Sequence, residues 1–516
     1  MSEKLFKSTA IVSMMTFISR ILGFVRDIVI ARLFGAGIGA DVFFVAFKIP
    51  NFLRRLFAEG AFSQAFIPVL AEYRQRGDKD LKQLIANTSG TLAGILFAIT
   101  ALGVIAAPLL IMVFAPGFID NPHKITLAGD LLKITFPYLF FISLTALAGS
   151  ILNSFGKFAV PAFTPVFLNL SLIACALWLS PHLDEPVTAL AWGVFIGGTV
   201  QLLFQIPFLI KIGQLPKPRW GWKDSGVQKI LTLMIPAMFG VSVAQINLLL
   251  DTLLASFLVT GSISWLYYSD RLVEFPLGVF GIALSTVILP SLSKKHATAS
   301  KAEFSHTIDW ALRWVFIIAT PAAIGLIWLA EPLLMSLFQY GEFTPQDAHK
   351  ASLSLMAYGL GLLPFIFIKV LAPGYYARQD TKTPVKIGII AMVTNMVLNI
   401  ILMMHYAHVG LALATSLSAA LNAALLYIGL RKREVYQPDA GWGRFILKLL
   451  VPNSLLLLVL FWFTPDITHW IDGSVWQRFA MLSSLISGAM IAYFSTLYLV
   501  GINVKQLLKP NLVKND

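Results

Sequence analysis

Long apolar segments recur along almost the whole of this chain, and they constrain its fold more than any other feature. About 20 consecutive apolar residues span the hydrocarbon core of a bilayer as an α-helix. The 516 residues are 57% hydrophobic and 13% charged, which is unlike an ordinary soluble domain. We therefore predict an all-α polytopic membrane protein with about 14 transmembrane helices, over residues 8–33, 40–70, 85–115, 128–153, 159–180, 187–211, 227–259, 263–292, 307–337, 352–377, 385–405, 408–430, 446–464 and 479–501.

The distribution of Lys and Arg between the connections predicts how these helices are oriented. With both termini in the cytoplasm, the cytoplasmic connections and tails hold 26 Lys and Arg, and the opposite side holds Lys124, Lys350 and Arg478. This asymmetry follows the positive-inside rule. The net charge of +13 then faces an anionic leaflet, so no nucleic-acid partner is needed to account for it. Trp220 and Trp222 are typical of anchors at the membrane interface.

The chain contains an internal repeat. The segment that starts with "GADVFFVAFKIPNF" at Gly39 aligns, after a shift of 222 residues, with the segment that starts with "GSISWLYYSDRLVE" at Gly261. Chance resemblance between two apolar helices is the alternative interpretation. Two repeats of six helices are a common plan of transporters. We therefore predict an N-lobe (1–212), a cytoplasmic linker (213–226), a C-lobe (227–432) and a C-terminal part with two further helices and a tail (433–516).

The predicted spans at 8–33, 40–70 and 263–292 carry groups of charged residues, although each charge at mid-membrane costs about 2.5–3.5 kcal/mol on insertion scales. In the first span, Arg20, Arg26 and Asp27 share one broad helical face with Gly23, whereas Arg32 lies opposite and near the helix end. Arg32 can therefore reach the interface. The other charges must face a hydrated cavity or pair with one another.

Arginine is the most informative residue type among these charges. Ion pairs that only hold helices together are the alternative for any one residue, above all for Asp27 with Arg20 or Arg26. Arginine outnumbers what such pairing needs, and it suits bidentate binding of phosphate or carboxylate. We predict a cavity between the lobes for an anionic substrate, lined by Arg20, Arg26, Arg54, Arg271, Arg55, Asn51 and Lys48, with Asp27, Asp41, Asp270, Glu59 and Glu274 as charge partners and Gly23 as a hinge or a packing position.

The chain lacks the motifs of nucleotide-driven or metal-dependent chemistry. The one Gly-Lys pair, Gly156-Lys157, is followed by Phe158 and does not have the spacing of a phosphate-binding loop. The eight histidines lie in connections or near span ends. We therefore expect a transporter rather than an enzyme, with no metal site and no cofactor. Uphill transport would draw on a coupling cation, Na⁺ or H⁺, or on the membrane potential.

The last two predicted spans contrast with the span at 40–70, because their central segments carry no charge. "LLVPNSLLLLVLFWF" and "FAMLSSLISGAMIAYFSTLYLVG" suit ordinary lipid-facing helices, and they also suit a groove for an acyl or prenyl tail. In the second case, Ser483 and Ser487 are expected on the inner face of the groove.

Three longer segments resemble one known family. "SRILGFVRD", "GAGIGADVFFVAFKIPNFLRRLFAEGAFSQAFIPV" and "YYARQDTKTPVKI" closely resemble the MurJ/MviN family, the lipid II flippases of bacterial peptidoglycan synthesis within the MOP transporter superfamily. The resemblance spans the chain. It implies export of lipid II, a polyprenyl-diphosphate-linked disaccharide-pentapeptide, across the bacterial inner membrane by alternating access. The family's cavity residues fall on Arg20, Arg26, Arg54, Arg271, Asp27 and Asp41, and its lipid-tail groove falls on the last two helices.

The resemblance also implies a coupling ion and partners. Some members of the family are reported to hold sodium in the second lobe, and the candidate residues here are Asp251, Thr394, Asn395 and Asn399. An Asp251 that is merely paired is the alternative. The resemblance also suggests other proteins of cell-wall synthesis and division as partners. Competing functions are a flippase for another polyprenyl-linked saccharide, a MOP-type cation or drug antiporter, a membrane enzyme and a structural scaffold.

Overall fold

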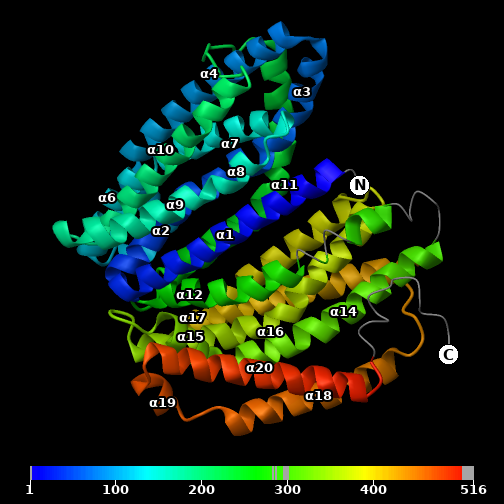
Figure 1. Ribbon diagram of the computed structural model, residues 1–516. Helices are drawn as coiled ribbons and strands as arrows, with labels where there is room; N and C mark the ends of the chain where they lie inside the picture. The colour runs from blue at the N-terminus through cyan, green and yellow to red at the C-terminus, as the bar shows by residue number, and fades with distance from the viewer. Residues whose placement is uncertain (1–2, 282–283, 285–287, 294–300, 503–516) are drawn as a thin grey trace. The chain divides into compact units, whose positions relative to one another are not determined.

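Figure 1 shows the computed structural model, in which every described element is a helix. The structure describes residues 3–281, 284, 288–293 and 301–502, without the side chains of residues 3–10, 57–60 and 239–244. Packing divides the chain into two compact units, Met1–Ser264 and Trp265–Asp516. Each unit is described by itself.

The first unit is built from helices of very different lengths. They are α1 (Glu3–Phe34), α2 (Ile38–Arg54), η1 (Arg55–Phe62), α3 (Ser63–Arg76), α4 (Asp78–Ile105), α5 (Ala107–Phe114), η2 (Pro116–Phe118), α6 (Pro122–Thr135), α7 (Tyr138–Ser154), α8 (Ala159–Phe163), α9 (Pro165–Ala174), η3 (Cys175–Leu179), η4 (Ser180–His182), α10 (Thr188–Lys211) and α11 (Ser225–Ala255). Proline accounts for two of the breaks. Pro108 stands at the start of α5, and Pro137 precedes α7, because proline lacks a backbone N–H and this group has no helical partner in the first turn of a helix.

The second unit contains most of α12 and the helices that follow it. They are α12 (Ser262–Pro276), η5 (Leu277–Gly281), α14 (Lys301–Trp328), α15 (Ala330–Phe338), α16 (Pro345–Tyr376), α17 (Lys382–Lys432), α18 (Trp442–Phe463), α19 (Ile467–Asp472) and α20 (Val475–Leu499). The long α17 is two helices joined at Ala407, whose backbone is not helical (φ 48°, ψ −129°). This break agrees with the two spans predicted at 385–405 and 408–430.

Nine helical stretches in the described part are long and apolar enough to cross a membrane. They cover ten of the predicted spans, because α17 contains two of them. The described residues of the predicted spans at 8–33, 40–70, 227–259 and 263–292 are mostly helical as well, but these spans carry charged residues or include residues outside the described part. The all-α membrane fold is therefore confirmed, and the count of 14 stays a prediction.

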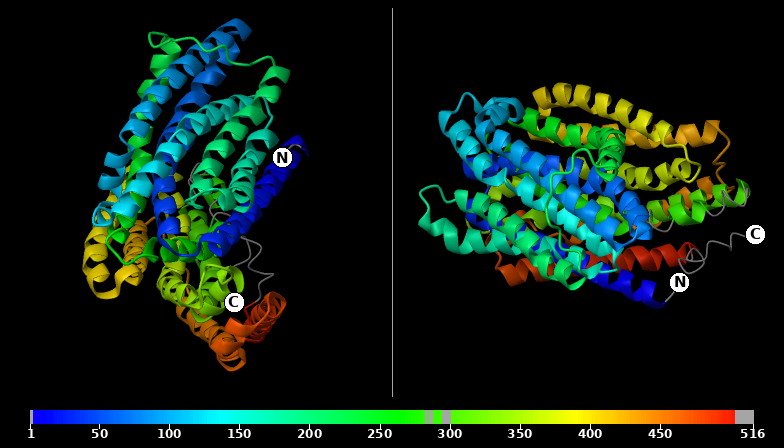
Figure 2. Two further views of the ribbon diagram at one scale, coloured as in Figure 1. Left: turned by 90° about the vertical axis from the view of Figure 1, so that its left-hand side faces the viewer. Right: turned by 90° about the horizontal axis from the view of Figure 1, so that it is seen from above.

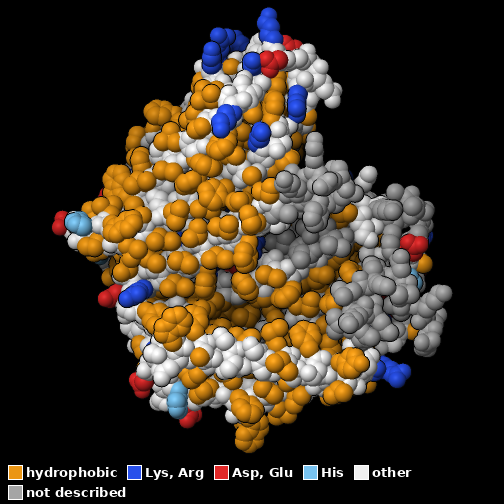
Figure 3. All heavy atoms as spheres, viewed as in Figure 1, with side chains coloured by type: hydrophobic (Ala, Val, Ile, Leu, Met, Phe, Trp, Pro, Cys, Tyr) orange, Lys and Arg blue, Asp and Glu red, His pale blue; other side chains and the backbone are white. Residues whose placement is uncertain are grey.

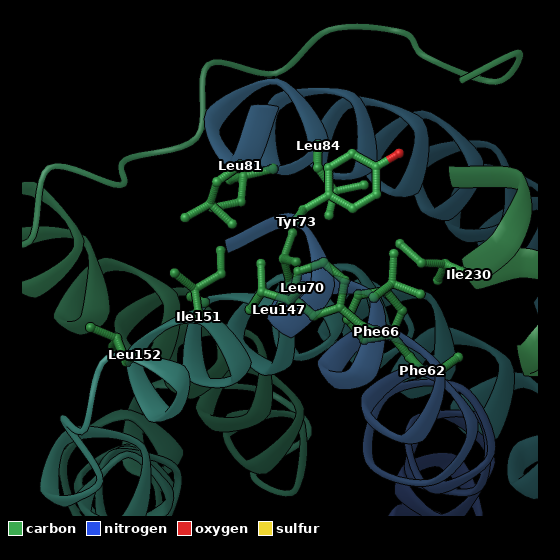
Figure 4. Packing of buried hydrophobic residues seen from close by; sticks show 14 of the residues in the cluster. Phe62, Phe66, Leu70, Tyr73, Leu81, Leu84, Leu147, Ile151, Leu152 and Ile230 are labelled. Atoms are coloured by element: carbon green, nitrogen blue, oxygen red, sulfur yellow. The ribbon is translucent and has the colours of Figure 1, made fainter. Parts of the chain in front are cut away.

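A cluster of buried side chains holds α3, α4, α7 and α11 together in the first unit. Phe66 of α3 lies in this cluster with Leu84 of α4, Ile151 of α7 and Ile230 of α11 (Figure 4). Because α11 packs on these helices, the first compact unit extends past it to Ser264. The compact units meet at Ser264. The sequence instead predicts a boundary between the repeats in the linker 213–226.

π-helical segments recur at the same register in both predicted repeats. η1 begins at Arg55 and η5 begins at Leu277, which are 222 residues apart (277 minus 55). That distance is the shift that aligns the two sequence segments. A third π-helical segment, η3, has no such counterpart, because the residues 222 positions later lie in the α-helix α17. The division into two repeats therefore stays a prediction.

The segment between α10 and α11 lies along α4 (Figure 2, long green loop at the top of the left view). Arg219 N donates to Ala86 O at 3.0 Å. Trp220 and Trp222 stack with ring centroids 6.3 Å apart, and both side chains are exposed. A pair of exposed Trp rings suits the interfacial position predicted for them.

Basic and apolar side chains occupy different parts of the visible surface of the first unit. Figure 3 shows apolar side chains over the flank and Lys and Arg at the end formed by α3 and the start of α4. The exposed basic residues of that end include Arg74, Arg76, Lys79 and Lys82. An apolar flank that ends in a basic rim is what a membrane-spanning helical unit requires.

Candidate functional site

Arg26 and Asp27 form a buried ion pair on α1. Arg26 Nη2 lies 2.6 Å from Asp27 Oδ1, and the two side chains are 7% and 2% exposed. Arg26 Nη1 also donates to Asn169 Oδ1 of α9 at 3.0 Å. Of the two arginines that the sequence offers as partners of Asp27, Arg26 is therefore the one that binds it. The carboxylate and the amide offset the cost of burying the guanidinium.

Asn169 contacts α1 at a second point, close to Gly23. Its Nδ2 donates to Ser19 O at 3.1 Å. A Cβ added at Gly23 would lie 3.6 Å from Asn169 Nδ2, which is an ordinary van der Waals distance. Space alone therefore does not require glycine here, and the hinge stays a prediction.

Arg20 and Arg32 are both exposed, and neither forms an ion pair with the side chains that the structure describes. Arg32 lies in the last turn of α1, where a positive charge is favourable beside the unpaired carbonyl groups of the helix end.

Asp41 of α2 is buried, and it binds the start of α12. Its Oδ1 accepts hydrogen bonds from Ser264 N at 2.9 Å and Ser264 Oγ at 2.6 Å, and its Oδ2 accepts from Gly261 N at 2.7 Å. The first turn of a helix has N–H groups without helical partners, and Asp41 supplies acceptors for them. Its described contacts are therefore with these groups rather than with an arginine.

Asn51 and Arg54 contact each other at the end of α2. Arg54 Nε donates to Asn51 Oδ1 at 2.7 Å. Both residues are partly exposed, as are Lys48 and Arg55, and Arg55 begins η1. Two of the residues predicted to line the cavity are thus joined directly. The side chain of Glu59 lies outside the described residues.

Arg271 of α12 is held by residues of its own helix. Its Nη1 lies 2.8 Å from Glu274 Oε2, and its guanidinium carbon lies 5.3 Å from the centroid of the Tyr267 ring. Arg271 is partly exposed, and Asp270 and Glu274 are exposed. The cation is thus oriented by an acid and an aromatic face and still reaches solvent.

The predicted cation-binding residues lie on α11 and α17. Asn399 Nδ2 donates to Asn395 Oδ1 at 2.9 Å, and Asn395 Nδ2 donates to Ser418 Oγ at 3.3 Å. The second of these bonds joins the two halves of α17, which meet at Ala407. Thr394 is partly exposed, and Asp251 lies on α11 in the first unit. The grouping of these residues around a cation stays a prediction.

An apolar groove of about 430 Å³ lies between α18 and α20. Ser483 and Ser487, expected on its inner face, are exposed and do not line it, and the neighbouring positions Ser484 and Gly488 do so instead. The correction follows from helix geometry, because one residue turns the helix by about 100°. The residues that line the groove are Val459, Phe463, Pro465, Met481, Ser484, Leu485 and Gly488.

Comparison with known proteins identifies the family. The family model described as "Lipid II flippase MurJ" matches residues 30–480. The chain belongs to the MurJ family. A relative from Vibrio cholerae, named probable lipid II flippase MurJ, is 56% identical over 98% of both chains. A relative from Burkholderia cenocepacia, named lipid II flippase MurJ, is 42% identical over 96% of this chain and 98% of its own.

Solved structures agree with this membership. A structure described as lipid II flippase MurJ in an inward closed conformation matches with a TM-score of 0.82 and 29% identity, over 96% of this chain and 99% of the other. A multidrug resistance MATE family transporter of the MOP superfamily matches with a TM-score of 0.67 and 14% identity, over 81% of this chain and 94% of the other. The second match shows a shared fold alone. The MurJ family is a family of transporters, as the sequence predicts, rather than of enzymes.

Asn169 and Ser264 contact predicted site residues, and sequence reasoning missed both. A signal for Asn169 does exist, because an amide side chain stands alone among Leu and Phe in "PVFLNLSLIA". Polar side chains within membrane helices usually find hydrogen-bond partners. Ser264 carries no such signal, since a serine near a helix start is common.

Proposed function

We propose that this member of the MurJ family moves lipid II from the cytoplasmic to the periplasmic leaflet of the inner membrane by alternating access. The observation that carries the proposal is a match along nearly the whole chain to relatives named as lipid II flippases, at 56% identity for the Vibrio cholerae protein. An arginine-rich set of partly exposed and buried side chains supports it, because the diphosphate of lipid II is an anion that guanidinium groups bind in pairs of hydrogen bonds.

In this proposal the diphosphate binds to Arg20, Arg26, Arg54 and Arg271. Two of these guanidinium groups are already oriented by amide side chains, since Arg26 contacts Asn169 and Arg54 contacts Asn51. Orientation before binding lowers the entropy that binding costs. Lys48, Asn51 and Arg55 line the same cavity and add charge and hydrogen bonds.

The polyprenyl tail is assigned to the groove between α18 and α20. The groove is apolar and open, so it can shield part of a prenyl chain while the head group crosses. Trp220, Trp222 and the basic end of the first unit mark the cytoplasmic interface in this proposal, with both termini on that side. Energy comes from the membrane potential or from a cation gradient.

Purified protein in vesicles with fluorescent lipid II tests the function. A reagent that destroys label only in the outer leaflet should reach a larger fraction of lipid II when the protein is present. Another labelled polyprenyl-diphosphate saccharide is the matched control, and it should cross at least about tenfold more slowly. Equal rates for both lipids would favour a flippase of broader specificity, and no transport of either would overturn the proposal.

A further inference from the structure

Asn169 of α9 makes two hydrogen bonds to α1, one on each side of Gly23. Its Nδ2 donates to Ser19 O at 3.1 Å, and its Oδ1 accepts from Arg26 Nη1 at 3.0 Å. The side chain is buried. A carbonyl can only accept and a guanidinium can only donate, so the two bonds together determine the orientation of the amide.

The acceptor at Ser19 is the carbonyl that α1 would release on bending at Gly23. In an α-helix this oxygen accepts from the N–H of the residue four positions later, which is Gly23. A carbonyl has two lone pairs, so the bond from Asn169 can exist beside the helical bond. If the helical bond breaks, Ser19 O keeps a partner. A side chain inserted into the helical ladder is one of the established causes of helix bending.

Gly23 makes the same turn of α1 the easiest one to open. Glycine weakens a helix because it gains more conformational freedom than other residues when the helix opens. A Cβ at this position would lie 3.6 Å from Asn169 Nδ2 and 3.8 Å from Asn169 Oδ1. An alanine therefore fits without moving α9, and it changes only the flexibility of the turn.

We propose that Asn169 is a positioning residue that couples bending of α1 at Gly23 to the orientation of Arg26. The inference rests on the proposed function, in which Arg26 binds the substrate diphosphate. Bending at Gly23 changes the distance between Ser19 and Arg26, and Asn169 is bonded to both. A change at either bond therefore shifts the amide and the guanidinium that depends on it.

Hydrogen exchange in the full-length protein without substrate tests the hinge. Gly23→Ala should slow exchange of the amide at position 23 by about two- to fivefold, since alanine favours the closed helix. Asn169→Ala should slow it by about fivefold or more, because the released Ser19 carbonyl then has no partner. Asn169→Asp should act in the same direction, because a carboxylate cannot donate to that carbonyl.

A matched control on the same helix is Ser171→Ala. Ser171 Oγ donates to Gly193 O of α10 at 2.8 Å, so this change should leave exchange at position 23 as it is. Faster or unchanged exchange in Asn169→Ala would overturn the proposal, because a side chain that only packs α9 against α1 would protect the amide rather than assist its opening.

Transport assays separate failure of the inference from failure of the proposed function. In Asn169→Asp the carboxylate can still accept from Arg26, so affinity for lipid II should persist while flipping slows by about tenfold. Arg26→Ala should lose affinity instead. Normal flipping by Asn169→Asp at a normal protein level would overturn the coupling alone. Absence of flipping in the unaltered protein would overturn the function, and the exchange data would still decide on the hinge.

Discussion

At the scale of single residues, the pair of Arg26 and Asp27 has to satisfy two demands. Its side chains are almost fully buried, and removing one partner of a buried ion pair costs about 3–5 kcal/mol. The arginine that is proposed to bind substrate is thus also one that stabilises the fold. A simple alanine change at Arg26 therefore mixes two effects.

A double variant separates the two effects. Arg26→Ala should lower the amount of folded protein, because Asp27 loses the guanidinium that lies 2.6 Å away. Arg26→Ala combined with Asp27→Asn should restore the amount, since the buried charge is gone, and should still fail to flip lipid II. Immunoblots of membrane fractions and the vesicle assay measure the two properties. Arg32→Ala is the control, and normal flipping by the double variant would exclude Arg26 from the site.

The charged residues of α1 could be predicted from the sequence, but the amide that orients them could not be placed. Charges within an apolar span stand out by their cost, and one helical face collects Arg26 and Asp27. Asn169 lies 143 residues away from Arg26 in the sequence. Helical periodicity relates residues within a helix and gives no information on which distant helix packs against it.

At the scale of helices, the predicted apolar spans agree well with the structure, and the exceptions have local causes. Hydropathy does not detect the π-helical η1, which begins at Arg55. The regular step of about 100° per residue holds only for an α-helix. Positions around a helix axis can therefore be derived from the sequence up to Arg55, but not for Glu59 beyond it.

Asp380, in the connection between α16 and α17, links the stability of this turn to pH. Hydrogen bonds from the Thr383 hydroxyl and backbone N–H, with a further bond from Arg433, hold the pKa of Asp380 at about 2, below its ordinary 3.8. Because the pKa is lowered on folding, the stabilisation is present above the unfolded value and disappears as the pH falls from about 4 to about 2.

Asp380→Asn tests this link. The melting temperature in detergent should drop at about pH 7, and the difference from the unaltered protein should shrink at about pH 3. Thr383→Ser retains a hydroxyl that can donate and should behave almost like the unaltered protein. A deficit of Asp380→Asn that does not change with pH would show that ionisation of this carboxyl does not stabilise the turn.

The groove between α18 and α20 offers a test at the scale of one helix pair. A Cβ at Gly488 would meet no atom within 4 Å, so Gly488→Leu should fill the groove without disturbing the helices. Flipping of lipid II should fall at least about threefold, while membrane insertion stays normal. Ser487→Leu adds the same side chain at the exposed neighbouring position and should flip normally. Equal rates in both variants would remove the groove from the transport path.

At the scale of the whole molecule, a repeat can be predicted from the sequence, whereas the compact units cannot. Gly39 and Gly261 align at a shift of 222 residues, and η1 and η5 begin at the same shift. The boundary of the first compact unit at Ser264 depends on how α11 packs. Packing between helices depends on the shapes of side chains throughout the bundle. A comparison of two sequence segments gives no information about those shapes.

The source of energy also concerns the whole molecule, and Asp251 tests one form of it. If sodium binds at Asp251 with Asn395 and Asn399, Asp251→Asn should weaken the dependence of flipping on sodium, because a cation loses its one charged ligand. Flipping measured at several sodium concentrations with a fixed potential gives the result. Unchanged sodium dependence would take Asp251 out of the coupling site.

The membrane potential is the second proposed energy source. The positive charge of the proposed cavity supports it. The sequence contains no nucleotide-binding motif, and Arg20, Arg26, Arg54 and Arg271 give the proposed cavity an excess of positive charge. Moving one charge through 100 mV corresponds to about 2.3 kcal/mol, enough to return an empty positive cavity toward the negative cytoplasm. We expect flipping to stop when a potassium ionophore clamps the vesicles at zero potential, and to continue without ATP while an inside-negative potential is held. Flipping that follows ATP at a clamped potential would contradict this, because the cavity charge would then have no part in driving the return.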